Sequence, residues 1–210
     1  MRFFIAGPAG RLEATLWLPK DGSAPRAAAV MCHPHPVAGG TMDNNVVFRA
    51  SRGLQTAGFA VLRFNFRSAG ASEGDHDGEG AEEQDVVAAL DELEARYPAL
   101  ELWAGGFSFG SRTVGSLARR ERRIRRVCLV APPSRVYDCG FVRELSQPTL
   151  VLLAENDEFG TPSDFRERVG ELPPNFEIET VSGVDHFFRG KTPELERRVR
   201  AWAERMLEPR

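Results

Sequence analysis

Short runs of apolar residues recur along the chain and are separated by turn residues. Leu12 to Leu18 alternates apolar and polar positions and, with Phe3 to Ala6, predicts the antiparallel start of a sheet. Ala27 to Cys32 is apolar without alternation, as expected of a strand covered on both faces. Five further strands are predicted at Phe59 to Phe66, Leu100 to Ala104, Arg126 to Ala131, Thr149 to Ala154 and Phe176 to Val181.

Helical periodicity fills the intervals between these strands. Apolar residues recur three or four positions apart from Val46 to Ala57 and from Val86 to Tyr97. Thr161-Pro162 and Thr192-Pro193 are typical helix starts, and another helix is expected after Gly110. Because strands alternate with helices after the antiparallel start, the pattern predicts an α/β fold with a mainly parallel sheet and helices on both faces.

Length and composition narrow the class of protein. The 210 residues predict a single domain spanning 1–210. Apolar residues make up 42% and the net charge is -3, which is ordinary for a globular protein and gives no reason to expect nucleic acid as a partner. No apolar run reaches membrane-spanning length, and the N-terminus lacks the apolar region of a signal peptide, so a cytoplasmic location and no membrane association are expected.

Gly106 to Gly110 spells G-x-S-x-G between a predicted strand and a predicted helix, with Ser108 at the apex of the turn. Such a turn strains the backbone and brings it close to its neighbours, which favours glycine two residues before and after the serine. The start of the following helix presents free N–H groups, which would stabilise a developing oxyanion. The pentapeptide alone is also compatible with a glycine-rich turn that caps a helix.

A serine nucleophile requires a base and a carboxylate that orients the base. His186 follows the last predicted strand and is the leading candidate for the base. The loop after Thr149 to Ala154 offers Asp157, which we favour as the acid, and Glu155 as the alternative. The three candidates then follow separate strands, in the order Ser108, Asp157, His186.

This order resembles that of serine hydrolases of the α/β-hydrolase superfamily. More narrowly, CHPHPVAGGTMDNNVV and RFNFRSAGASEGDHDGEGAEEQD resemble a group of small bacterial hydrolases distantly related to dienelactone hydrolases. The resemblance implies an oxyanion hole made by the backbone N–H of Phe109 and by an N–H of the loop after the third strand. Since neither proline of His33-Pro34-His35-Pro36 has an N–H, His35 is the expected donor. Dienelactone hydrolases carry cysteine at the elbow, whereas this chain has Ser108, so dienelactone is not the expected substrate.

Many superfamily members insert a lid after the strand that follows the elbow helix. The corresponding interval here, residues 132–147, is too short for a large lid, which predicts an open site for small or accessible acyl groups. The expected activity is cofactor-free hydrolysis of a small-molecule carboxylic ester, or of a thioester. Four apolar side chains are expected to line the site: Phe107, Val136, Phe159 and Phe187.

Other features have simpler interpretations. The group Asp75, His76, Asp77 and Glu79 fits no calcium loop, so a solvated loop is expected, and no metal site is predicted. The arginine-rich run from Arg119 to Arg126 is expected to be a solvated surface rather than a polyanion site. The three cysteines are expected to be small buried residues. A peptidase or amidase using the same triad, or a binding protein with a catalytically silent hydrolase fold, remains open, as does the oligomeric state.

Overall fold

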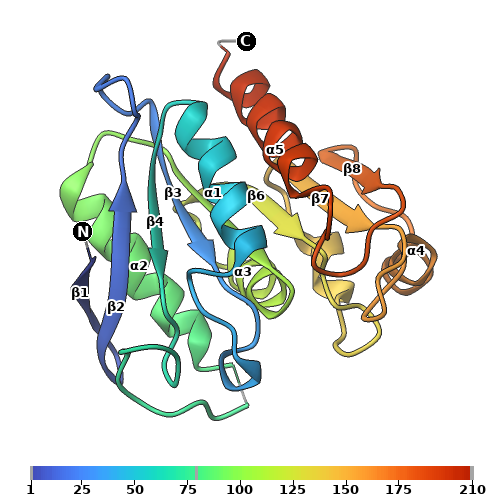
Figure 1. Cartoon of the computed structure of the whole chain (residues 1–210), viewed down its shortest axis with the longest axis horizontal. Coiled ribbons are helices and arrows are strands. Elements are labelled where there is room, and N and C mark those ends of the chain that lie inside the picture. Colours follow the sequence, from blue (N-terminus) through green and yellow to red (C-terminus); the bar gives the residue numbers. More distant parts are fainter. Residues whose placement is uncertain (1, 79, 209–210) are drawn as a thin grey trace.

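The computed structural model describes residues 2–78 and 80–208, and these form one eight-stranded sheet (Figure 1). The strand order is β1-β2-β4-β3-β5-β6-β7-β8. β1 and β2 are antiparallel to their neighbours, and all other neighbouring pairs are parallel. The strands are β1 (Arg2–Gly7), β2 (Gly10–Trp17), β3 (Ala27–Cys32), β4 (Phe59–Phe64), β5 (Leu102–Phe107), β6 (Ile124–Val130), β7 (Thr149–Ala154) and β8 (Phe176–Val181).

Helices cover both faces of this sheet, as the alternation of strands and helices predicts. One face packs against α1 and α5, which lie against each other, and the other packs against α2, α3 and α4 (Figure 1). The helices are α1 (Asn45–Thr56), α2 (Glu82–Arg96), α3 (Phe109–Ala118), α4 (Pro162–Val169) and α5 (Thr192–Leu207), with two short 3-10 turns, η1 (Pro36–Ala38) and η2 (Gly140–Glu144). In the described part of the chain no helix is long and apolar enough to cross a membrane.

Burial on both faces explains why the central strands are apolar throughout. Every residue of β3, β4, β5 and β7 is buried. The apolar core divides into two clusters, one on each face of the sheet. Because the central strands are parallel, the loops that follow their carboxyl ends lie together along one edge of the sheet.

The fourth strand ends earlier than the sequence predicts. It stops at Phe64, although the Asn65 N–H still donates to the Glu13 carbonyl oxygen of β2 at 2.8 Å. The next contacts reach the loop after β3 instead. The Asn65 side chain accepts a hydrogen bond from the Met42 N–H at 2.7 Å, and the Phe66 N–H donates to His33 Nε2 at 2.9 Å. An apolar run thus continues beyond its strand because Phe66 leaves the ladder to hold the loop after β3.

The arginine-rich run is largely paired with acidic side chains. Arg123 contacts Asp91 and Glu94 of α2 at 2.6 and 2.9 Å, and also Glu121 at 2.9 Å. Further ion pairs join Arg119 to Glu144, Arg120 to Glu83 and Arg126 to Glu101. These pairs compensate much of the positive charge, in agreement with a surface role for this run.

Candidate active site

Ser108 lies at the turn between β5 and α3 and has φ 54° and ψ -118°, a strained conformation for a residue with a side chain. A Cβ atom on Gly106 would lie 2.3 Å from the Gly110 carbonyl group. A Cβ on Gly110 would lie 2.6 Å from the His33 carbonyl oxygen and 2.7 Å from that of Cys32. Both glycines are therefore required by close backbone packing, and Gly110 brings the serine turn into contact with the loop after β3.

His186 and Asp157 meet at the same edge of the sheet, after β8 and β7 respectively. His186 Nδ1 lies 2.9 and 2.8 Å from the two carboxylate oxygens of Asp157, and both side chains are buried. The Phe159 N–H also donates to Asp157 Oδ1 at 2.8 Å. An ionised carboxylate accepts the Nδ1 proton, which leaves Nε2 of a neutral imidazole free to accept another.

Glu155, the alternative acid, has a different partner. Its Oε2 accepts a hydrogen bond from the Gly183 N–H at 2.7 Å, and its side chain is exposed. Of the two acids considered, Asp157 is thus the one that contacts His186, and Glu155 holds the loop that leads to this histidine.

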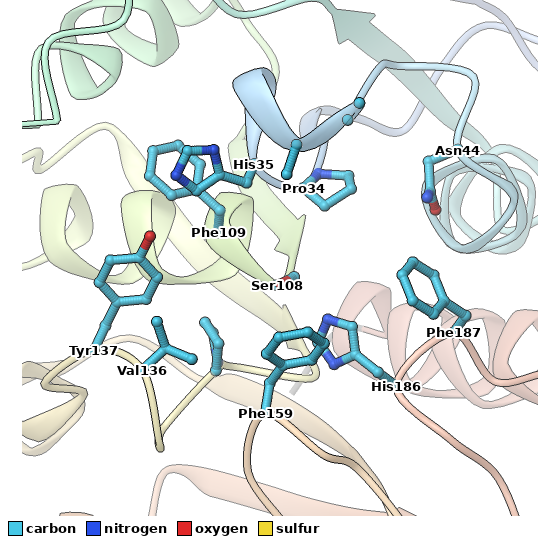
Figure 2. A pocket seen from close by; sticks show the side chains of 14 residues that line it. Pro34, His35, Asn44, Ser108, Phe109, Val136, Tyr137, Phe159, His186 and Phe187 are labelled. Atoms are coloured by element: carbon cyan, nitrogen blue, oxygen red, sulfur yellow. The ribbon is translucent and has the colours of Figure 1, made fainter.

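Ser108 and His186 line one cavity (Figure 2). Its volume is about 240 Å³. The Ser108 hydroxyl makes no hydrogen bond to any described residue, so its contact with His186 is not formed in this conformation. Hydrogen bonds between catalytic groups are often long before substrate binds. The lining is mostly apolar and aromatic: Pro34, His35, Ala38, Gly39, Gly40, Asn44, Phe109, Pro133, Val136, Tyr137, Phe159 and Phe187 complete it.

Three of the four side chains predicted to line the site do so. Val136, Phe159 and Phe187 surround the cavity and are partly exposed (Figure 2). Phe107 is the exception, because its side chain is fully buried and lies outside the cavity lining. Its ring centroid is 4.8 Å from that of His186. The prediction for Phe107 was therefore wrong: as the last residue of a strand covered on both faces, it supports the histidine instead.

The N–H groups of His35 and Phe109 donate no hydrogen bond within the described residues. Both residues border the cavity that contains Ser108 (Figure 2). The His35 carbonyl accepts hydrogen bonds from the N–H groups of Ala38 and Gly40 at 3.2 and 3.0 Å, which closes the loop into a compact turn. The two predicted oxyanion donors are thus unpaired and lie on adjoining segments.

The buried side chain of His33 anchors the loop after β3. This side chain is fully buried, and its Nε2 accepts the Phe66 N–H. Burial lowers the pKa of His33 to about 4, so the imidazole is neutral near pH 7 and can act as an acceptor. His33 therefore shapes the loop that carries His35.

Sequence reasoning missed Tyr137 in the cavity wall and the hydrogen bond between His76 and Glu82. His76 was expected to be solvated, but its side chain is only 12% exposed and its Nδ1 lies 2.5 Å from Glu82 Oε1. The available signal was Glu82 itself, an acidic residue at the start of a helix six positions after a histidine. Residue Glu79 of the same predicted loop lies outside the described residues.

Among the described residues no group of three or more histidine, cysteine, aspartate or glutamate side chains is arranged to hold a metal ion. The three cysteines, Cys32, Cys128 and Cys139, are free and buried, as predicted. Burial raises the pKa of both the Cys128 and the Cys139 thiols to about 12. At neutral pH these thiols are protonated and serve as small apolar side chains.

Residues 26–206 match the alpha/beta hydrolase domain family, and the chain belongs to this family. An uncharacterised protein from Rickettsia prowazekii is 33% identical over 207 residues, which cover 94% of this chain and 86% of that protein. The crystal structure of a serine hydrolase without a lid from Xanthomonas campestris is 31% identical, with a TM-score of 0.91 over 100% of this chain and 96% of that one. An esterase domain from Rhodothermus marinus shares the fold at 21% identity, with a TM-score of 0.77 over 98% of each chain.

The segment after β6 is compact, like the corresponding part of a hydrolase without a lid. Residues 131–148 contain turns and η2, with no α-helix. Val136 and Tyr137 of this segment reach the cavity wall (Figure 2). The fold is therefore the mainly parallel α/β-hydrolase sheet with antiparallel N-terminal strands and no large lid.

Proposed function

We propose that this protein is a serine hydrolase that cleaves carboxylic esters through Ser108, His186 and Asp157. His186 Nε2 takes the hydroxyl proton of Ser108 while Oγ attacks the ester carbonyl carbon, and the carbonyl π electrons move to oxygen. As the tetrahedral intermediate collapses, His186 returns the proton to the leaving alcohol. His186 then activates a water molecule, which releases the acid and regenerates the serine.

The observation that carries this proposal is the buried His186–Asp157 hydrogen bond beside a strained serine in one cavity. A carboxylate held at 2.8 Å from Nδ1 fixes the histidine tautomer and stabilises the imidazolium that forms during the reaction. A purely structural role for His186 would explain its contact with Asp157, but not the presence of a strained serine at the same cavity. The φ of 54° at Ser108 is a strain that a nucleophile elbow explains.

The free N–H groups of His35 and Phe109 support the same mechanism. Phe109 is the first residue of α3, where unpaired N–H groups and the helix dipole favour negative charge. An oxyanion that accepted hydrogen bonds from both donors would be stabilised most strongly in the transition state.

The cavity indicates the substrate class. About 240 Å³ lined mostly by aromatic and aliphatic side chains suits a short or flat apolar acyl group. Phe159 and Phe187 are each 37% exposed, so the opening offers apolar contact without enclosing a long chain. No cofactor is required for the proposed reaction.

The experiment is a comparison of ester hydrolysis by the wild type, Ser108→Ala and Ser116→Ala. Ser116 lies in the same helix as the elbow and outside the cavity lining, so its variant is the matched control. We expect 4-nitrophenyl acetate and butyrate to be cleaved faster than the palmitate, by the wild type and Ser116→Ala alike. Activity that survives in Ser108→Ala, or its absence in the wild type, would refute the proposal.

A further inference from the structure

A cluster of three rings lies at the proposed oxyanion hole. The ring centroids of His35 and Phe109 are 4.9 Å apart, and Figure 2 shows these two side chains together at the cavity wall. The His76 ring lies 4.8 Å from His35 and 5.8 Å from Phe109. The two residues whose backbone N–H groups would bind the oxyanion therefore share one side-chain cluster with His76, which does not itself line the cavity.

His76 is held in place by a buried carboxylate. Glu82 is the first residue of α2, and its side chain is fully buried. Glu82 Oε1 meets His76 Nδ1 at 2.5 Å, while Glu82 Oε2 has no partner among the described residues. The helix N-terminus favours this carboxylate, but burying it without a hydrogen bond would be costly. The contact therefore fixes both groups.

A second contact closes the loop onto the cluster. The His76 backbone N–H donates to Ser68 Oγ at 2.6 Å, so both the backbone and the ring of His76 are anchored. By contrast, the His35 imidazole has a buried Nδ1 without a hydrogen-bond partner among the described residues. The His35 side chain is therefore held by ring packing against its neighbours rather than by a hydrogen bond of its own.

We propose that His76 and Glu82 form a positioning pair that holds the ring of His35 against Phe109 and thereby keeps the two oxyanion N–H groups aligned. This inference rests on the proposed esterase function. His33 and Gly40 fix the loop through a buried side chain and a backbone hydrogen bond, and the positioning pair supports it through the His35 ring. Oxyanion donors act through preorganised geometry. A small displacement of His35 therefore reduces the stabilisation of the transition state more than it reduces the affinity for substrate.

Three variants separate ring packing from the hydrogen bond. His76→Asn retains a side-chain N–H for Glu82 but removes the ring. The double variant His76→Phe with Glu82→Leu retains a ring and replaces both polar partners, which avoids an unpaired buried carboxylate. Asp75→Asn is the control, because Asp75 is exposed in the same loop and lies outside the ring cluster.

We expect His76→Asn to lower kcat on 4-nitrophenyl butyrate about 10-fold with KM unchanged, because one oxyanion donor becomes misaligned rather than lost. Its affinity for butylboronic acid, which forms a tetrahedral adduct with an active serine, should fall by a similar factor. The double variant should recover kcat to near the wild-type value, and Asp75→Asn should match the wild type. Thermal unfolding of each variant shows whether a loss of kcat follows a loss of stability instead.

An unchanged kcat in His76→Asn would overturn the positioning role, and so would a rise in KM at constant kcat. A double variant that keeps its melting temperature but stays as slow as His76→Asn would overturn the role of the ring. In both cases the wild type would still hydrolyse the ester and Ser108→Ala would not, so the proposed function would stand. If the wild type shows neither hydrolysis nor boronate binding, the proposed function fails first.

Discussion

The contact between Gly110 and the loop after β3 makes a substitution at this position informative. Gly110→Ala places a Cβ atom 2.6 Å from the His33 carbonyl oxygen, whereas ordinary contact begins near 3.4 Å. The three nearest atoms all belong to the backbone of residues 32 and 33, so no side chain can rotate away. Either α3 or the loop that carries His35 must move.

The matched comparison is Gly115→Ala in the same helix. Its Cβ would meet the ring of Phe141 at 2.3 Å, but that ring is a partly exposed side chain and can shift. Alanine is intrinsically preferred to glycine inside a helix by about 1 kcal/mol. This preference stabilises Gly115→Ala more than Gly110→Ala, because Gly110 lies in the first turn of the helix. Only Gly110→Ala forces two backbone segments apart.

Overpacking that the structure cannot relieve costs about 1–3 kcal/mol. For a chain of this length each kcal/mol corresponds to about 2–4 °C in Tm. We therefore expect Gly110→Ala to lower Tm by several degrees and kcat at least about 10-fold, because the displaced loop carries an oxyanion donor. Gly115→Ala should stay close to the wild type in both.

Differential scanning calorimetry and hydrolysis of 4-nitrophenyl butyrate measure these two quantities. If Gly110→Ala and Gly115→Ala unfold at the same temperature and turn over substrate equally fast, the close packing of the elbow against the loop does not constrain the site. A loss of Tm with full activity would show that the loop moves without disturbing the oxyanion hole.

Two further predictions follow from the same geometry. Asp157→Asn should lower kcat by about 10⁴-fold, because the amide cannot hold the histidine in the required tautomer; Glu155→Gln should change it little, and equal effects would contradict the assignment. Burial lowers the pKa of His33 to about 4 from an unfolded value of 6.5. The unfolded state therefore binds this proton first, and the free energy of unfolding should fall by up to about 3 kcal/mol between pH 6.5 and pH 4. In urea titrations, the free energy of unfolding of His33→Gln should depend less steeply on pH over this range than that of the wild type. Equal slopes for the two proteins would exclude His33 as the source of the pH dependence.

The sequence predicts much of the fold because its strands are short, apolar and well separated. Each predicted strand is present, and the antiparallel start and the helices on both faces are confirmed. The pattern does not specify the order β4-β3-β5 at the centre of the sheet, because strand order depends on which surfaces pack together. The early end of β4 also escapes prediction, since the Phe66 N–H bonds to His33, a residue distant in the chain.

The candidate site, like the fold, could be predicted only in part from the sequence. Ser108, Asp157 and His186 could be proposed because each follows a strand, and parallel strands bring their carboxyl ends together. The contact of His76 with Glu82 depends on how the loop after β4 folds back onto α2, and the acidic residue at the start of α2 is by itself too weak a signal to predict it. Phe107 was misjudged because proximity to the serine in sequence does not determine the face on which a side chain is buried.

The most direct test of the central claim is to identify the residue modified by a fluorophosphonate. Such a probe reacts with a serine only when a base activates its hydroxyl. After treatment of the folded protein, peptide mass spectrometry should find one adduct, on Ser108, and preincubation with butylboronic acid should prevent it. An adduct on another residue, or none on Ser108 in folded protein, would contradict the assignment of Ser108 as the nucleophile.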